Sequence, residues 1–277
     1  TAPGLNHSHF TALQVKNALV DAQRDLWRER SSIDLDDPDL SLHLHLGRGE
    51  AQLSLDGSGG SLHRRGYRAA MGAAPLKENL AAGLIRLTGW DESQPLVDPC
   101  CGSGVLLIEA ALAALQQAPG LERRFALEGW ADFQPELWDR EVDRARQRRR
   151  GDLTLPLLLG IEADPTIADQ ARANVEAAGL SGVIRICTGS FEAEALPDGP
   201  GMLVCNPPYG QRIGDEQELD ALYSALGQYV RQEASGWQLW LLSGNPKLTG
   251  ALRLKASRRI PVSNGGIDCR WLQYEIR

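Results

Sequence analysis

The sequence predicts a doubly wound α/β domain with a mostly parallel sheet, preceded by a smaller α+β segment. From residue 75 onward, short apolar runs typical of buried strands alternate with stretches of helical period. A glycine-rich turn follows the first of these strands and opens a helix, as in nucleotide-binding α/β folds. The chain finishes with two extended runs, which we expect to add an antiparallel last strand to the sheet.

The N-terminal segment reads as one helix followed by a β-hairpin. Residues 11–29 place leucines and a tryptophan near one helical face, with Thr11 as the expected N-cap. Strict alternation then predicts strands over 40–46 and 51–55, joined by a turn at Gly47–Gly49. Because the leucines of both strands share one face, we expect that face to be buried.

The remaining elements follow in order, with one interruption at 118–154. This stretch does not fit the alternation, and it reads as an insertion that contains one amphipathic helix. We expect helices at 76–88, 103–117, 165–178 and 217–233, strands at 94–98, 155–161, 183–187, 201–205 and 237–242, and extended runs at 252–259 and 267–276.

Composition narrows the class of protein. The chain has 277 residues, of which 43% are hydrophobic and 23% charged, and no apolar run approaches the roughly 18 residues of a membrane span. Its five cysteines lack any zinc-type spacing, so we expect reduced thiols in a cytoplasmic protein, no metal and no membrane. The net charge of −7 argues mildly against a nucleic-acid partner.

A glycine-rich turn in "LVDPCCGSG", residues 96–104, predicts a ligand site. Gly102 and Gly104 let the backbone approach a ligand, and the following helix offers its N-terminal amides. Asp98, at the end of the strand, suits an amino-acid ammonium, which dinucleotides lack. The next strand ends in "GIEADP", where Glu162 would meet a ribose diol and Asp164 lies just beyond. Asp98 and Glu162 indicate S-adenosylmethionine; the alternative is that these two acids cap helix N-termini.

The stretch "LVCNPPYGQR", residues 203–212, predicts a rigid turn at the end of the fourth strand. Two prolines stop both helix and sheet there. Asn206 presents an amide oxygen, and the carbonyl of Pro207 precedes a residue without an N–H. These two acceptors can hold both hydrogens of an exocyclic amine, while Tyr209 offers a ring on which a planar base can stack.

Basic residues form two short groups that could contact RNA. The first is "HRRGYR", with Arg64, Arg65 and Arg68. The second is the arginine run of the insertion, which ends in Arg148, Arg149 and Arg150 and which we expect on its helix. The competing interpretation of this run is a solvated helix face.

The combination of "DPCCGSG" and "NPPY" resembles class I S-adenosylmethionine-dependent methyltransferases that modify planar amino nitrogens. Further stretches resemble the guanine-N2 methyltransferase half of the bacterial bifunctional 23S ribosomal RNA large-subunit methyltransferase K/L. These are "RGYR", "APLKE", "DPCCGSGVLLIEAA", "APGL", "NPPYGQR" and "NGGIDC". The resemblance implies a seven-stranded class I sheet at 75–277, a linker at 63–74, and the distal part of a THUMP RNA-binding domain at 1–62.

The same resemblance assigns roles to individual residues. It places Asp98, Cys100, Gly102, Gly104, Glu162, Asp164, Ser190, Phe191 and Asn206 around S-adenosylmethionine, and Asn206, Pro207 and Tyr209 around the target guanine. Lys77 and Glu78 of "APLKE" would be secondary cofactor contacts. Ser190 stands where the family carries an acid that meets the adenine amine, so this contact is open.

The function implied is methyl transfer to the N2 amine of a guanine in 23S ribosomal RNA. The front of the THUMP domain and a second methyltransferase domain would then be absent from this chain. The alternatives are the same chemistry on transfer RNA guanine, DNA adenine or protein glutamine, a non-catalytic RNA-binding module, and a nicotinamide-dependent oxidoreductase. Asp98 and "NPPY" disfavour the oxidoreductase.

Overall fold

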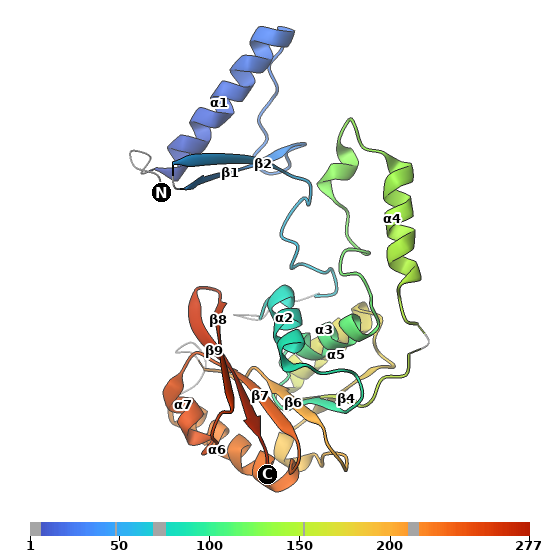
Figure 1. Ribbon diagram of the computed structural model, residues 1–277, viewed down its shortest axis with the longest axis vertical. Helices are drawn as coiled ribbons and strands as arrows, with labels where there is room; N and C mark the ends of the chain where they lie inside the picture. The colour runs from blue at the N-terminus through green and yellow to red at the C-terminus, as the bar shows by residue number, and fades with distance from the viewer. Residues whose placement is uncertain (1–6, 48, 69–75, 152, 210–215) are drawn as a thin grey trace. The chain divides into compact units, whose positions relative to one another are not determined.

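Figure 1 shows the computed structural model of the chain, which describes residues 7–47, 49–68, 76–151, 153–209 and 216–277. The chain divides into two compact units. One comprises Thr1–Ser61 with Arg124–Arg140, and the other comprises Leu62–Arg123 with Glu141–Arg277. Each unit has a hydrogen-bonded sheet of its own.

The second unit is built on one seven-stranded sheet, which confirms the predicted α/β class. Its strand order is β5-β4-β3-β6-β7-β9-β8. The first five strands in this order pair in parallel, and β9 pairs antiparallel with both β7 and β8. The strands are β3 (Leu96–Asp98), β4 (Leu158–Glu162), β5 (Ile184–Thr188), β6 (Met202–Cys205), β7 (Gln238–Ser243), β8 (Arg258–Asn264) and β9 (Ile267–Glu275).

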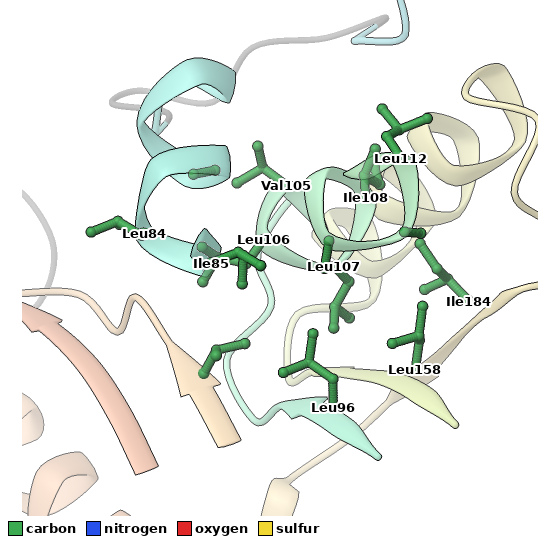
Figure 2. Packing of buried hydrophobic residues seen from close by; sticks show 14 of the residues in the cluster. Leu84, Ile85, Leu96, Val105, Leu106, Leu107, Ile108, Leu112, Leu158 and Ile184 are labelled. Atoms are coloured by element: carbon green, nitrogen blue, oxygen red, sulfur yellow. The ribbon is translucent and has the colours of Figure 1, made fainter. Parts of the chain in front are cut away.

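Helices cover both faces of this sheet and enclose two hydrophobic clusters. They are α2 (Glu78–Thr88), α3 (Val105–Ala114), α5 (Pro165–Ala177), α6 (Glu216–Glu233) and α7 (Pro246–Ala251). Helix α3 is apolar around nearly its whole circumference because it is buried on all sides. Figure 2 shows Leu106 and Leu107 of this helix over Leu96 of β3 and Leu158 of β4. The other cluster forms beneath α6 and α7, where Leu226 and Leu248 are buried.

The C-terminal part differs from the sequence prediction at one place. The extended run expected at 252–259 is wrong for most of its length, because β8 begins only at Arg258. The short helix α7, which was not expected, precedes it. Its N-cap is Asn245, whose side chain accepts a hydrogen bond from the backbone of Lys247 at 3.0 Å, and Pro246 occupies the first turn.

The first unit contains helix α1 (Ser8–Trp27) and the hairpin of β1 (Ser41–Gly47) and β2 (Glu50–Asp56). The helix and hairpin are confirmed, but Thr11 is not the cap. The side chain of His7 caps α1 by accepting from the backbone N–H of Phe10 at 3.1 Å, and Thr11 lies within the helix. The expectation of a buried leucine face is also wrong among the described residues. Leu40, Leu42, Leu53 and Leu55 are all exposed, because two strands alone enclose no core.

Part of the insertion belongs to this first unit. The segment 118–154 contains the short helix η1 (Ala126–Gly129) and α4 (Pro135–Gln147), which is amphipathic as expected. The N–H of Leu127 donates to the carbonyl of Gly57 at 3.1 Å. A Cβ added to Gly57 would lie 3.4 Å from Leu127 and from the ring of Trp130. The end of the hairpin therefore packs closely against η1.

The described helices contain no segment long and apolar enough to cross a membrane. All five cysteines are free thiols, and three of them, Cys101, Cys205 and Cys269, are buried.

Substitution of two glycines that lie within helices tests the packing of the second unit. A Cβ at Gly227 of α6 would lie 2.3 Å from the carbonyl oxygen of Leu252, whereas a Cβ at Gly83 of α2 meets nothing within 4 Å. We expect Gly227→Ala to lower the free energy of unfolding by about 1–3 kcal/mol. Gly83→Ala should raise it by about 0.5–1 kcal/mol. Urea denaturation of both variants measures this, and equal effects would contradict the packing of α6 against α7.

Candidate active site

The candidate site lies where the strand order of the sheet reverses. Strand β3 comes first in the sequence of this unit. The next two strands, β4 and β5, lie on one side of it, and the following two, β6 and β7, lie on the other. Open α/β sheets bind ligands in the crevice at the carboxyl ends of such strands. Asp98 ends β3 and Asn206 directly follows β6, and these two strands pair in parallel. The two sequence-predicted halves of the site therefore meet at adjacent strand ends.

The glycine turn after β3 has the backbone that its sequence predicts. Gly102 has φ +52° and Gly104 has φ +80°, a region that side chains with a Cβ rarely adopt. The N–H of Cys101 donates to the carbonyl of Ile161 in β4 at 2.9 Å. Helix α3 begins directly after Gly104, so its free N-terminal amides face this turn.

Asp98 is a buried carboxyl group, with 1% of its surface exposed. Its Oδ1 accepts a hydrogen bond from the backbone N–H of Cys100 at 3.1 Å. The pKa of Asp98 is raised to about 8, mainly by burial; the hydrogen bond from Cys100 opposes this rise, and the nearby negative charge of Glu162 contributes to it. A cation bound beside Asp98 would offset the cost of burying the charged carboxylate.

Glu162 connects two loops at the ends of β3 and β4. One carboxylate oxygen accepts from the N–H of Gly102 at 2.9 Å, and the other accepts from the N–H of Asp164 at 3.0 Å. Asp164 itself caps α5, accepting from the N–H groups of Thr166 and Ile167 at 2.8 and 3.2 Å. Asp164 therefore caps a helix N-terminus, whereas Glu162, for which capping was the alternative, accepts from the glycine turn instead.

The loop after β5 carries Ser190 and Phe191. Ser190 is the N-cap of the short helix η2 (Phe191–Ala193) and accepts from the N–H of Glu192 at 3.3 Å. Phe191 is buried, and its ring centroid lies 5.2 Å from that of Tyr229 on α6. Ser190 stands at the same sheet edge as Glu162, since the N–H of Gly189 donates to the carbonyl of Glu162 at 2.9 Å.

Asn206 carries an acceptor without a partner. Its Oδ1 is buried, and among the described residues it forms no hydrogen bond. A buried acceptor left unpaired typically costs about 1–3 kcal/mol, and a donor supplied by a bound substrate would remove this cost. Pro207 beside it is also buried. The last residues of the predicted motif, Gly210, Gln211 and Arg212, lie outside the described residues.

The hydroxyl of Tyr209 is held by a part of the chain that sequence reasoning did not connect with it. Asn264 donates from Nδ2 to the Tyr209 hydroxyl at 2.8 Å, and the thiol of Cys269 lies 3.6 Å from the same oxygen. Both residues belong to the stretch "NGGIDC". That stretch was a sequence signal for the family, but nothing in it indicated a contact with Tyr209.

Two of the arginines expected to contact RNA have structural partners instead. Arg65 pairs with the buried Glu109 at 3.4 Å, and Arg68 pairs with the buried Glu78 at 3.7 Å. Their side chains are only 14% and 7% exposed. Tyr67 also donates to Glu109 at 2.9 Å, so this segment is anchored to α3. Burial raises the pKa of Glu109, which the charge of Arg65 opposes.

The arginine run is split between two environments. Helix α4 ends at Gln147, so Arg148, Arg149 and Arg150 follow it rather than lie on it as expected. Arg150 donates its backbone N–H to Leu115 at 2.8 Å and pairs with Glu92 at 3.3 Å. Its partners give it a structural role. Arg64, Arg148 and Arg149 are exposed.

Comparison with known proteins identifies the domains. Residues 65–273 match the model of the RMKL-like methyltransferase domain, and residues 3–56 match the THUMP domain. A protein of Synechocystis sp., slr0064, described provisionally as an RNA methyltransferase, is 46% identical over 99% of this chain and 71% of its own length. The ribosomal RNA large subunit methyltransferase K/L of Syntrophotalea carbinolica is 45% identical over 98% of this chain, which spans 40% of that protein.

Solved structures agree with this match. SMU.472, provisionally described as a methyltransferase, was solved in complex with SAH; it has a TM-score of 0.85 at 30% identity, covering 95% of this chain and 69% of its own. A protein from Clostridium difficile 630, provisionally described as a methylase, has a TM-score of 0.85 at 32% identity, covering 95% of this chain and 69% of its own. The chain therefore belongs to the RMKL-like methyltransferase family, with a THUMP domain before the catalytic domain, and its cofactor is S-adenosylmethionine.

Proposed function

We propose that this chain transfers a methyl group from S-adenosylmethionine to the exocyclic N2 amine of a guanine in 23S ribosomal RNA. The observation that carries the proposal is the buried, unpartnered Oδ1 of Asn206 beside the switch point of the sheet. An amine hydrogen would satisfy this acceptor. The K/L relatives are named for ribosomal RNA, and the THUMP match is consistent with an RNA substrate.

The cofactor would occupy the crevice above β3 and β4. Asp98 would hold the ammonium of the methionine part, and the turn from Cys100 to Gly104 would lie against the methionine chain. Glu162 would bind the ribose diol while keeping its bonds to the loop amides. Ser190 and Phe191 would border the adenine, and Asp164 would stay at the helix cap.

The amine pocket would be formed by Asn206, Pro207 and Tyr209. The sulfonium methyl is already a strong electrophile, so positioning is the main contribution of the protein. The guanine amine is a poor nucleophile because its lone pair is conjugated into the ring. Acceptors at Asn206 and Pro207 would localise that lone pair and stabilise charge that grows on nitrogen in the transition state. The proton can leave afterwards, so the reaction needs no strong base.

The substrate base must be unpaired or rotated out of its helix to reach this pocket, where it would stack on Tyr209. Since the whole chain carries a net charge of −7, RNA binding would depend on local basic groups. The exposed Arg64, Arg148 and Arg149 are the candidates. Arg65, Arg68 and Arg150 would support these groups through their ion pairs.

A DNA adenine target is the second candidate, because a 30%-identical structure from Listeria monocytogenes, with a TM-score of 0.84, is named as a predicted N6-adenine-specific DNA methylase. Adenine N6 is also a planar amine. To separate the targets, the chain would be incubated with methyl-labelled S-adenosylmethionine and ribosomal RNA, transfer RNA or DNA, and the labelled nucleoside identified by mass spectrometry. We expect N2-methylguanosine from ribosomal RNA. Label only in N6-methyladenosine would contradict the proposed target.

Asn206→Ala should lower the rate of methyl transfer by roughly 10²–10³, because one acceptor for the transition state is removed. Asn206→Asp keeps an acceptor oxygen and should retain clearly more activity than the alanine variant. Single-turnover rates measure the effect, and calorimetry should show S-adenosylmethionine affinity within a few-fold of the parent in both variants. An alanine variant with more than a tenth of the parent rate would contradict the role.

The raised pKa of Asp98 predicts a pH-dependent cofactor affinity. Without ligand the carboxyl is protonated below about pH 8, so the bound ammonium must displace that proton. Affinity for S-adenosylmethionine should therefore rise as pH increases from 6 to 7.5, by up to about tenfold per unit. Asp98→Asn, which cannot titrate, should bind weakly and with little pH dependence. Calorimetry at several pH values tests this, and a flat profile in the parent would contradict it.

The exposed arginines beyond α4 predict a salt-dependent contribution to RNA binding. Reversing Arg148 and Arg149 to Glu should weaken RNA binding and flatten the slope of log affinity against log salt, by about 0.7–0.9 for each phosphate that is no longer neutralised. Reversal of Lys255 and Arg258, which are also exposed, changes the net charge equally and is the control. If both pairs had the same effect, the arginine run would be only a solvated face.

A further inference from the structure

The ring of Tyr209 is held from two directions by segments outside the "NPPY" turn. Its hydroxyl accepts a hydrogen bond from Asn264 Nδ2 at 2.8 Å and lies 3.6 Å from the thiol of Cys269. One edge of the ring packs against Gly244, where an added Cβ would lie 3.3 Å from the ring carbons and 3.2 Å from Ile267. Gly244 directly follows β7.

The β8–β9 turn reaches this place because of the strand pairing. Strand β9 runs antiparallel to β7, with Ser243 opposite Arg270, so its first residues lie at the carboxyl edge of the sheet. The turn between Asn264 and Ile267 consists of two glycines with φ +60° and +88°, which is the geometry of a tight hairpin. The turn thus brings Asn264 to a residue 55 positions earlier in the chain.

From this geometry we infer that Asn264 is a positioning residue for methyl transfer, which acts by fixing the ring of Tyr209 through its hydroxyl. The inference rests on the proposed role of Tyr209 as the stacking surface for the target base. A ring in contact with Gly244 and bonded at its hydroxyl has little freedom to tilt. The base stacked on it would then present its amine at a fixed distance from the sulfonium methyl, where a small displacement costs much of the rate.

The hydrogen bond has a neutral acceptor at working pH. Burial raises the pKa of Tyr209 to about 12, although the bond from Asn264 lowers it. The hydroxyl is therefore protonated near neutrality, and it accepts from Asn264 as a phenol rather than a phenolate. Removing the hydroxyl while keeping the ring separates positioning from stacking: Tyr209→Phe keeps the stacking surface and removes the contacts of the hydroxyl with Asn264 and Cys269.

A double-mutant cycle tests the inference. The variants are Asn264→Ala, Tyr209→Phe and the two combined, and Ser263→Ala, an exposed neighbour on β8, is the control. Each is assayed for kcat and KM with the RNA that the parent methylates. We expect each single variant to lower kcat by about three- to tenfold with KM and cofactor affinity within twofold. The kcat of the double variant should be no lower than that of the slower single variant. The kcat of Ser263→Ala should equal that of the parent.

Multiplying effects in the double variant would overturn the inference, because Asn264 would then act by another route. Unchanged kcat in Asn264→Ala would also overturn it. Urea denaturation controls for folding: if Asn264→Ala is unstable, Tyr209→Phe still tests whether the hydroxyl contributes to kcat, and a parent-like value contradicts the inference. The nucleoside formed by the parent is identified separately. A product other than N2-methylguanosine refutes the proposed target. The double-mutant cycle tests the role of Asn264 independently of this result, because it can be measured with whichever amine is methylated.

Discussion

The burial of Asp98 beside Glu162 is the constraint on which the rest of the site depends. Placing a carboxyl group at 1% exposure next to a second acid is costly unless a proton or a cation compensates it. This buried carboxyl group lies at the end of the central strand β3. There Glu162 already accepts a hydrogen bond from the backbone N–H of Gly102 in the glycine turn. In the proposed site, a cofactor with an ammonium group and a ribose diol would match both acids.

A hydrogen-bond acceptor without a partner lies at the end of the adjacent strand. Asn206 Oδ1 lacks a partner among the described residues, and it follows β6, which pairs directly with β3. One strand end thus carries a buried carboxyl group that a proton or a cation can compensate, and its neighbour carries an acceptor without a donor. Because β3 pairs with β6, the positions of Asp98 and Asn206 at the ends of these strands are fixed relative to each other. This separation of a cofactor side from an acceptor side is what group transfer between two bound molecules needs.

Much of this arrangement could be predicted from the sequence, because it depends on local patterns. Apolar runs and turn residues predicted every strand through β7, and "DPCCGSG" and "NPPY" predicted the turns after β3 and β6. The cap of α1 and helix α7 were missed although their signals are local, whereas other features were missed because they depend on contacts that join distant segments. Glu109 and Glu92 pair with Arg65 and Arg150 across 44 and 58 positions, so local sequence patterns did not indicate these ion pairs. The bond between Asn264 and Tyr209 likewise exists only once β9 pairs with β7.

A crystal structure of the chain with SAH and a short RNA containing the target nucleotide tests the central claim most directly. The measurement is the distance from the exocyclic nitrogen of the target base to Asn206 Oδ1. We expect about 2.8–3.2 Å, a hydrogen bond, with the base stacked on Tyr209 and the same nitrogen close to the carbonyl of Pro207. A base bound elsewhere, or an Asn206 Oδ1 satisfied by a protein group in the complex, would contradict the assignment of this pocket to the amine.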